Sequence, residues 1–183
     1  MTHSGTALID PYKIFAKIDL GPGMRVADLG CGRTGHFVFA ASQVIGDKGI
    51  VYAVDVIKNV LESVKSMAKT EGCDNVRTVW SDIELIGKTP IPDNSLDACF
   101  FINVLSQVKD KVSALGEATR MLHRDGFLIV VDWVKKLGGL GPTPELMLPA
   151  EKLTGLGAEK NLKPIDKSMA GDYHYAVIFQ KTV

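Results

Sequence analysis

Three glycines in the stretch VADLGCGRTGHF, residues 26–37, are the first feature with a chemical meaning. Gly30, Gly32 and Gly35 have the spacing G-x-G-x-x-G, which lets a backbone approach the pyrophosphate of a dinucleotide. Asp28, however, stands two residues before the first glycine. A carboxylate beside a pyrophosphate brings like charges together, whereas a carboxylate beside a cationic ligand attracts it. The stretch therefore predicts a ligand-binding loop and leaves the charge of its ligand open.

Acids and amides also follow the apolar segments of the chain at regular intervals. They are Asp28, Asp55, Asp82, Asn103 and Asp132. In an open α/β sheet the ligand binds beyond the carboxyl ends of the parallel strands, so residues at these ends share one site. A single polar residue at a strand end can be only a cap, but five together favour a polar binding site.

The spacing of these acids suits an adenosine ligand. Asp55 lies 20 residues after Gly35, and an acid at this distance accepts hydrogen bonds from both ribose hydroxyls. Asp82 and Ile83 offer a carboxylate and a backbone N–H to adenine, and Val56 offers an apolar surface to its ring. Because Asp28 disfavours phosphate, the ligand that fits best is S-adenosylmethionine (SAM), whose sulfonium is a cation.

The elements that would position these residues alternate between strand and helix. Strands are predicted at 24–30, 49–56, 75–80, 95–105, 127–133, 159–165 and 173–181, and helices at 10–18, 35–46, 57–72, 108–123 and from about 149. Alternation predicts parallel pairing with right-handed crossovers, whereas the short connection DKSMAG predicts an antiparallel hairpin. The expected fold is α/β and Rossmann-like: a doubly wound, mostly parallel seven-stranded sheet with an antiparallel C-terminal strand.

Length and composition narrow the possibilities. The 183 residues suit a single domain, 1–183, in which residues 1–20 include a possible lid helix. The 21 basic and 21 acidic residues cancel, which disfavours a dedicated nucleic-acid binder. We expect no membrane span, no signal peptide and a cytoplasmic protein. The cysteines Cys31, Cys73 and Cys99 have no zinc spacing, so no metal site is predicted.

VADLGCG, the strand ending in Asp55, SDIE and LDACFFINVL…FLIVVDW together resemble the class I SAM-dependent methyltransferase superfamily. The chain is most similar to the small-molecule branch that includes the ubiquinone/menaquinone C-methyltransferases, and the resemblance covers residues 20–134 well. It implies SAM as the cofactor and a small molecule as the methyl acceptor. INVL replaces the Asn/Asp-Pro-Pro-Tyr/Phe motif of enzymes that methylate nucleobase or glutamine amines, so no nucleic-acid partner is expected.

The resemblance implies roles for individual residues. The predicted cofactor-binding set is Asp28, Gly30, Cys31, Gly32, Gly35, His36, Asp55, Val56, Asp82, Ile83, Asn103 and Val104. In this set the glycine loop holds the methionine part of SAM, while Asn103 and Val104 face the centre of methyl transfer. The family commonly has G-x-G-x-G, and the insertion at Arg33-Thr34 makes this loop one residue longer. The contacts of Gly35 and His36 are therefore left open.

Residues for the acceptor are harder to assign, and the chain offers no obvious general base. Tyr173 and His174, in DYHYAVIF, are expected near the rim of the pocket, where they either bind the acceptor or pack the end of the sheet. Tyr12 belongs either to a lid or to a helix that covers the sheet.

Two other functions remain open. A nicotinamide-dependent oxidoreductase would explain G-x-G-x-x-G, but Asp28 and the short chain disfavour it. A non-catalytic SAM-binding or regulatory module would explain the small size. The cysteines also suggest arsenite methylation, which the position of Cys31 in the glycine loop and of Cys99 in a strand disfavours. The sequence does not set the oligomeric state.

Overall fold

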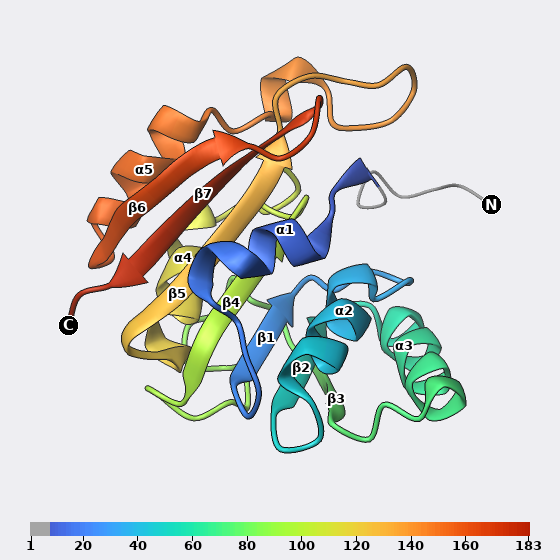
Figure 1. The fold of residues 1–183 in the computed structure, drawn as a ribbon. Coiled ribbons are helices and arrows are strands. Elements are labelled where there is room, and N and C mark those ends of the chain that lie inside the picture. Colours follow the sequence, from blue (N-terminus) through green and yellow to red (C-terminus); the bar gives the residue numbers. More distant parts are fainter. Residues whose placement is uncertain (1–7) are drawn as a thin grey trace.

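The computed structural model describes residues 8–183, and their strands form one sheet (Figure 1). The strand order is β3-β2-β1-β4-β5-β7-β6. The strands are β1 (Arg25–Leu29), β2 (Ile50–Asp55), β3 (Val76–Trp80), β4 (Leu96–Ile102), β5 (Leu122–Trp133), β6 (Leu162–Met169) and β7 (His174–Lys181). Strands β1 to β5 pair in parallel, whereas β7 is antiparallel to both β5 and β6. This topology confirms the predicted fold.

Helices cover both faces of the sheet. They are α1 (Pro11–Phe15), the short 3-10 helix η2 (Ala16–Ile18), α2 (His36–Ile45), α3 (Lys58–Glu71), α4 (Lys111–Met121), the 3-10 helix η3 (Pro144–Leu146) and α5 (Ala150–Ala158). Figure 1 shows α1 and α2 in front of the sheet and α4 behind it. In β1, Val26 packs in the core under α1–α3 and Ala27 in the core under α4 and α5. Burial on both faces explains why the central strands are continuously apolar.

The N-terminal helix packs onto the sheet. Asp10 caps α1 by accepting hydrogen bonds from the backbone N–H groups of Tyr12 and Lys13, and Pro11 fits the first helical position. Phe15 is buried, with its ring centroid 5.2 Å from that of Phe100 in β4 and 5.6 Å from that of Phe37 in α2. Of the proposed lid, residues 8–20 therefore cover the core, and residues 1–7 lie outside the described part.

The boundary between α4 and β5 lies at a different residue from the one predicted. The helix begins at Lys111 and ends at Met121, and β5 begins directly at Leu122, five residues earlier than expected. His123, expected at a helix end, is therefore in a strand, with Nε2 3.1 Å from Oδ1 of Asp97. The predicted helix at 108–123 and strand at 127–133 leave residues 124–126 between them, but pairing of β5 with β4 extends the strand through this segment with a shift in register.

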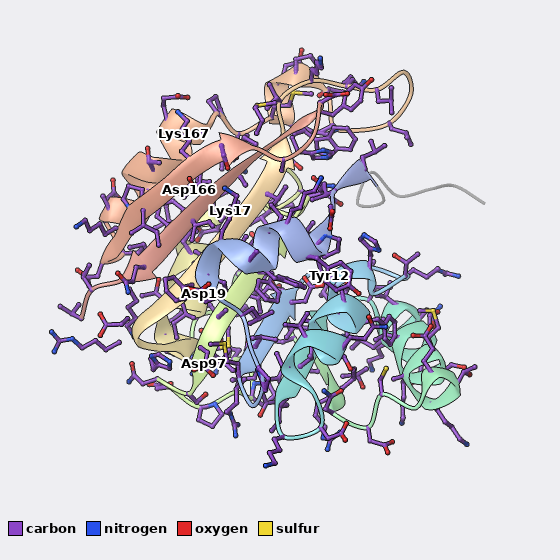
Figure 2. The ribbon with its side chains drawn as sticks, viewed as in Figure 1. Tyr12, Lys17, Asp19, Asp97, Asp166 and Lys167 are labelled. Carbon is purple, nitrogen blue, oxygen red and sulfur yellow. The ribbon has the colours of Figure 1, made fainter. Side chains whose placement is uncertain are left out.

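The C-terminal hairpin is also longer than predicted. Strand β6 reaches Met169, so four of the six residues of DKSMAG belong to the strand and the turn is confined to residues 170–173. Lys17 Nζ lies 2.7 Å from Asp166 Oδ2, and Figure 2 shows these side chains joining the segment after α1 to β6. No local sequence pattern predicts this ion pair, because its two residues are far apart in the chain. Within residues 8–183 no helix is long and apolar enough to cross a membrane.

The connection from β3 to β4, residues 81–95, contains no helix or strand. Glu117 of α4, which is fully buried, accepts hydrogen bonds from the backbone of Gly87 at 2.6 Å and Thr89 at 2.9 Å. Arg120 bonds both oxygens of Glu117 and the carbonyl of Thr89. A buried ion pair thus holds the crossover that begins beside Asp82.

Candidate functional site

Two cavities lie at the carboxyl ends of the parallel strands. The larger has a volume of about 870 Å³ and the smaller about 390 Å³. They share the lining residues Gly30, Gly32, Val104, Gln107 and Val108, so they form two halves of one cleft. The cleft lies where the strand order reverses between β1 and β4, the position expected for a ligand of this sheet.

The smaller cavity brings together the residues predicted for adenosine. Asp55, Val56, Asp82 and Ile83 all line it. The carboxylate of Asp55 is held at the end of β2 because its oxygens accept hydrogen bonds from the backbone of Gly32 at 3.2 Å and of Ile57 at 2.9 Å. Each carboxylate oxygen can accept a further hydrogen bond, so ribose hydroxyls fit beside these contacts.

The glycine loop approaches the segment after β4 closely. Gly30 has a φ of 84°, and a Cβ added there would lie 2.7 Å from Cγ2 of Val104. The longer loop is accommodated by a turn in which the backbone N–H of Gly35 donates to the carbonyl of Gly32 at 3.2 Å. The exposed side chains of Arg33 and Thr34 occupy this turn and line the larger cavity.

Gly35 and His36, both included in the predicted cofactor set, line neither cavity. Gly35 has a φ of 53° before the first turn of α2, and a Cβ there would lie 2.9 Å from the ring of Phe39. Nε2 of His36 lies 3.3 Å from the carbonyl oxygen of Ile9. In this structure Gly35 thus forms the left-handed start of α2, and His36 contacts the segment before α1.

Asp28 is the most unusual charged group of the cleft. It lines the larger cavity, its residue is 2% exposed, and Oδ1 has no hydrogen-bond partner among the described residues. Burial, and then the nearby charge of Asp55, raise the pKa of Asp28 to about 7. Burial also raises the pKa of the Cys31 thiol, which lines the same cavity, so this cysteine is held in its unreactive protonated form.

The segment after β4 also carries unsatisfied polar groups. Asn103 has a φ of 60°, and its buried Oδ1 has no partner within residues 8–183. Ser106 is buried and its Oγ is likewise without a partner there. Both residues line the larger cavity. Because buried polar groups are normally hydrogen-bonded, their gathering at one cavity with Asp28 indicates a site for a polar ligand.

The acid at the end of β5 has a structural role. Asp132 is fully buried and accepts hydrogen bonds from the backbone of Ser106 at 3.0 Å and Trp133 at 2.8 Å. It therefore fixes two residues that line the larger cavity, although it does not line the cavity itself.

None of the three residues predicted for the acceptor lines either cavity. Tyr12 is half exposed on α1, and its hydroxyl donates to Oε1 of Gln43 in α2 at 2.6 Å (Figure 2). His174 is 0% exposed, with its ring centroid 4.2 Å from that of Trp133. Burial lowers the pKa of His174 to about 4. The expected aromatic cluster exists, but Trp133, not His174 or Tyr173, faces the cleft.

Sequence reasoning missed most of the larger cavity. The missed lining residues include Arg33, Thr34, Phe37, Ser106, Gln107, Lys109, Lys111, Trp133, Gly141, Pro142 and Leu146. Several follow β4 and β5, and the available signal was their position in loops beyond carboxyl ends of strands. The glycine- and proline-rich segment 137–145 reaches over this half of the cleft, which its composition alone did not indicate.

Solved structures with this fold are SAM-dependent methyltransferases and related proteins. A SAM-dependent methyltransferase from Aquifex aeolicus is 26% identical, with a TM-score of 0.88 over 98% of this chain and 94% of that one. The [4+2]-cyclase SpnF, at 19% identity, has a TM-score of 0.79 over 94% of this chain and 80% of that one. The fold and the cleft thus define a class I methyltransferase-like protein.

The family follows from the sequence of the same region. The model of a methyltransferase domain family matches residues 20–164, and the chain belongs to this family, within the class I SAM-dependent methyltransferase superfamily. The ubiquinone/menaquinone biosynthesis C-methyltransferase UbiE of Shewanella sp. (strain W3-18-1) is 34% identical over 115 residues, which are 62% of this chain and 44% of that protein. The chain thus matches less than half the length of this curated relative.

Proposed function

We propose that this chain transfers a methyl group from SAM to a small-molecule acceptor. The observation that carries the proposal is the buried Oδ1 of Asp28, which has no hydrogen-bond partner within residues 8–183 and lies in a cleft whose other half is lined by Asp55 and Asp82. A cationic ligand with an adenosine group satisfies both halves. A dinucleotide does not, because its phosphates would lie beside Asp28.

The described residues fit each part of SAM. Asp55 accepts hydrogen bonds from the ribose hydroxyls, and Asp82 with the backbone of Ile83 binds adenine, against which Val56 packs. Asp28 and the buried Oδ1 of Asn103 face the ammonium of the methionine part. The close approach of Gly30 to Val104 leaves room only for backbone at the turn of the loop.

Bound SAM supplies a methyl group on a sulfonium sulfur: a bond forms from the acceptor atom to the methyl carbon as the carbon–sulfur bond breaks and its electrons return to sulfur. The residues of this chain align the acceptor and exclude water. Holding two reactants in line is worth roughly 7–11 kcal/mol, so the chain needs a general base only for a protonated acceptor atom.

A small acceptor suits the larger cavity, which segment 137–149 helps to enclose through Gly141, Pro142 and Leu146. The name of the UbiE relative, a C-methyltransferase of quinone biosynthesis, supports a small molecule in general terms. A non-catalytic SAM-binding role is the second candidate, because a fold and a cofactor cleft do not by themselves establish a reaction.

The test is incubation of the protein with methyl-labelled SAM and a cell extract divided into small-molecule, protein and nucleic-acid fractions. The proposal predicts label in the small-molecule fraction, and none when Asp55→Ala protein replaces the wild type. Label in the protein or nucleic-acid fraction would contradict a small acceptor. SAM binding with no transfer to any fraction would favour the non-catalytic role.

A further inference from the structure

The charges that line the cleft are segregated by sign. The ionisable side chains that line the smaller cavity are Asp55, Asp82 and Glu84, all of them acids. Those that line the larger cavity are Asp28 and three bases, Arg33, Lys109 and Lys111. The acids of the smaller cavity face the adenosine half of the cleft, whereas in the larger cavity the bases outnumber the one acid, Asp28.

The three bases of the larger cavity have no ion-pair partner in the described part of the chain. The nearby acids are occupied elsewhere: Asp110 accepts hydrogen bonds from Ser113, and Glu84 accepts one from the backbone of Asp110. Three unpaired bases at one cavity indicate that the missing counter-charge belongs to a ligand.

Lys111 is held at the cavity by a contact within the chain. Its Nζ donates a hydrogen bond to the carbonyl of Val108 at 2.7 Å. An ammonium has three donors, so two remain for a ligand. The same cavity contains the buried Oγ of Ser106, which has no partner among the described residues and can donate to an anionic oxygen.

Apolar side chains, one of them a tryptophan, also line the larger cavity. Trp133, Pro142 and Leu146 line it, and Trp133 is fixed by the ring of His174 behind it. A rigid aromatic wall suits the flat or apolar body of a small molecule.

We propose that the methyl acceptor is an anionic molecule with an apolar body, and that Ser106, Lys109 and Lys111 bind its negatively charged group. Arg33, in the glycine loop, is assigned to the carboxylate of the methionine part of SAM, and the two lysines remain for the acceptor. This inference rests on the proposed function, because it assigns the larger cavity to the acceptor.

The direct test uses a matched pair of probes in the presence of S-adenosylhomocysteine: 2-naphthoate and 2-naphthamide, which have the same ring system and differ in charge. Calorimetric titration is expected to give at least about tenfold tighter binding of the naphthoate, the scale of one hydrogen bond to a charged group. This preference should decrease as salt is added. Equal affinity for the two probes, or no binding of either, would overturn the proposal.

Three variants locate the effect. Lys109→Met and Lys111→Met keep the length of the side chain and remove its charge, and each should reduce the preference for naphthoate. Lys69→Met removes an exposed charge from α3 outside both cavities and should leave the preference unchanged. A preference that survives the double variant Lys109→Met/Lys111→Met would show that these lysines do not bind the anion.

A second measurement separates this inference from the proposed function. Small molecules that accept labelled methyl groups should be retained by an anion-exchange resin at neutral pH. Methylated products only in the unretained fraction would leave methyl transfer standing and overturn the anionic acceptor. Selective naphthoate binding without methyl transfer to any fraction would instead remove the proposed function and leave an anion-binding cavity.

Discussion

Gly30 and Val104 touch so closely that a side chain at the glycine would place its Cβ 2.7 Å from a methyl carbon of Val104. Both residues line both halves of the cleft. The first glycine of the loop is therefore required by the segment after β4 as well as by its own positive φ.

Gly30→Ala should destabilise the protein by about 1–3 kcal/mol, because the added carbon overpacks a well-filled contact. It should also weaken SAM binding. Gly155→Ala is the matched control: in α5 its Cβ would have no neighbour within 4 Å, and the change should stabilise by about 0.5–1 kcal/mol. Urea unfolding measures both. A Gly30→Ala protein as stable as the wild type would show that Gly30 and Val104 are not packed closely.

Asp28 should make stability depend on pH in a defined direction. Its pKa is raised from 3.8 to about 7, so the folded protein binds a proton that the unfolded chain releases in this range. The stabilisation of the folded state by protonation of Asp28 is therefore fully present below pH 3.8. The free energy of unfolding then decreases as the pH rises through 7. Asp28→Asn should have little effect near pH 4 and should increase stability at pH 8, in urea unfolding without ligand. An Asp28→Asn protein less stable than the wild type at pH 8 would contradict the claim that the buried Asp28 carboxylate destabilises the folded state.

Glu117 should be essential for the crossover between β3 and β4. Burial would raise the pKa of Glu117, but hydrogen bonds from Arg120 and the backbone of Gly87 and Thr89 lower it to about 2. Glu117→Ala should cost about 3–5 kcal/mol, because it leaves Arg120 without its partner. Glu71→Ala, at an exposed position at the end of α3, should change stability little. If Glu117→Ala lowers the free energy of unfolding by less than about 1 kcal/mol, the pair of Glu117 and Arg120 does not stabilise the crossover.

His174 should act on the acceptor only through Trp133. His174→Ala removes the ring that packs 4.2 Å behind Trp133, so 2-naphthoate should bind more weakly while SAM affinity is unchanged. His174→Phe restores an aromatic contact and should recover the affinity. If the phenylalanine variant binds 2-naphthoate as poorly as the alanine variant, the imidazole itself has a role that packing does not explain.

The parts of this site that the sequence predicted are those determined by local pattern. Apolar runs ending in Asp28, Asp55 and Asp82 predicted buried parallel strands, and parallel strands bring their carboxyl ends together. The residues expected to bind adenosine were therefore found in one cavity. The contacts of Gly35 and His36, which the longer loop left open, lie outside both cavities.

The acceptor half could not be predicted in the same way. Its lining depends on how segment 137–149 returns over the sheet and on which strand residue faces the cleft. His174 and Trp133 are neighbours through pairing of β5 with β7, and only the register decides that Trp133 is in front. The helix predicted at 108–123 ends earlier than expected, because tertiary pairing with β4 makes β5 begin at Leu122.

Calorimetric titration of SAM into wild-type and Asp55→Ala protein, with NAD as the competing ligand, is the most direct test of the central claim. The account predicts one SAM per chain, a loss of roughly 1.5–3 kcal/mol in the variant, and no comparable NAD binding. Tight binding of NAD without binding of SAM, or SAM affinity unchanged by Asp55→Ala, would contradict the assignment of this cleft.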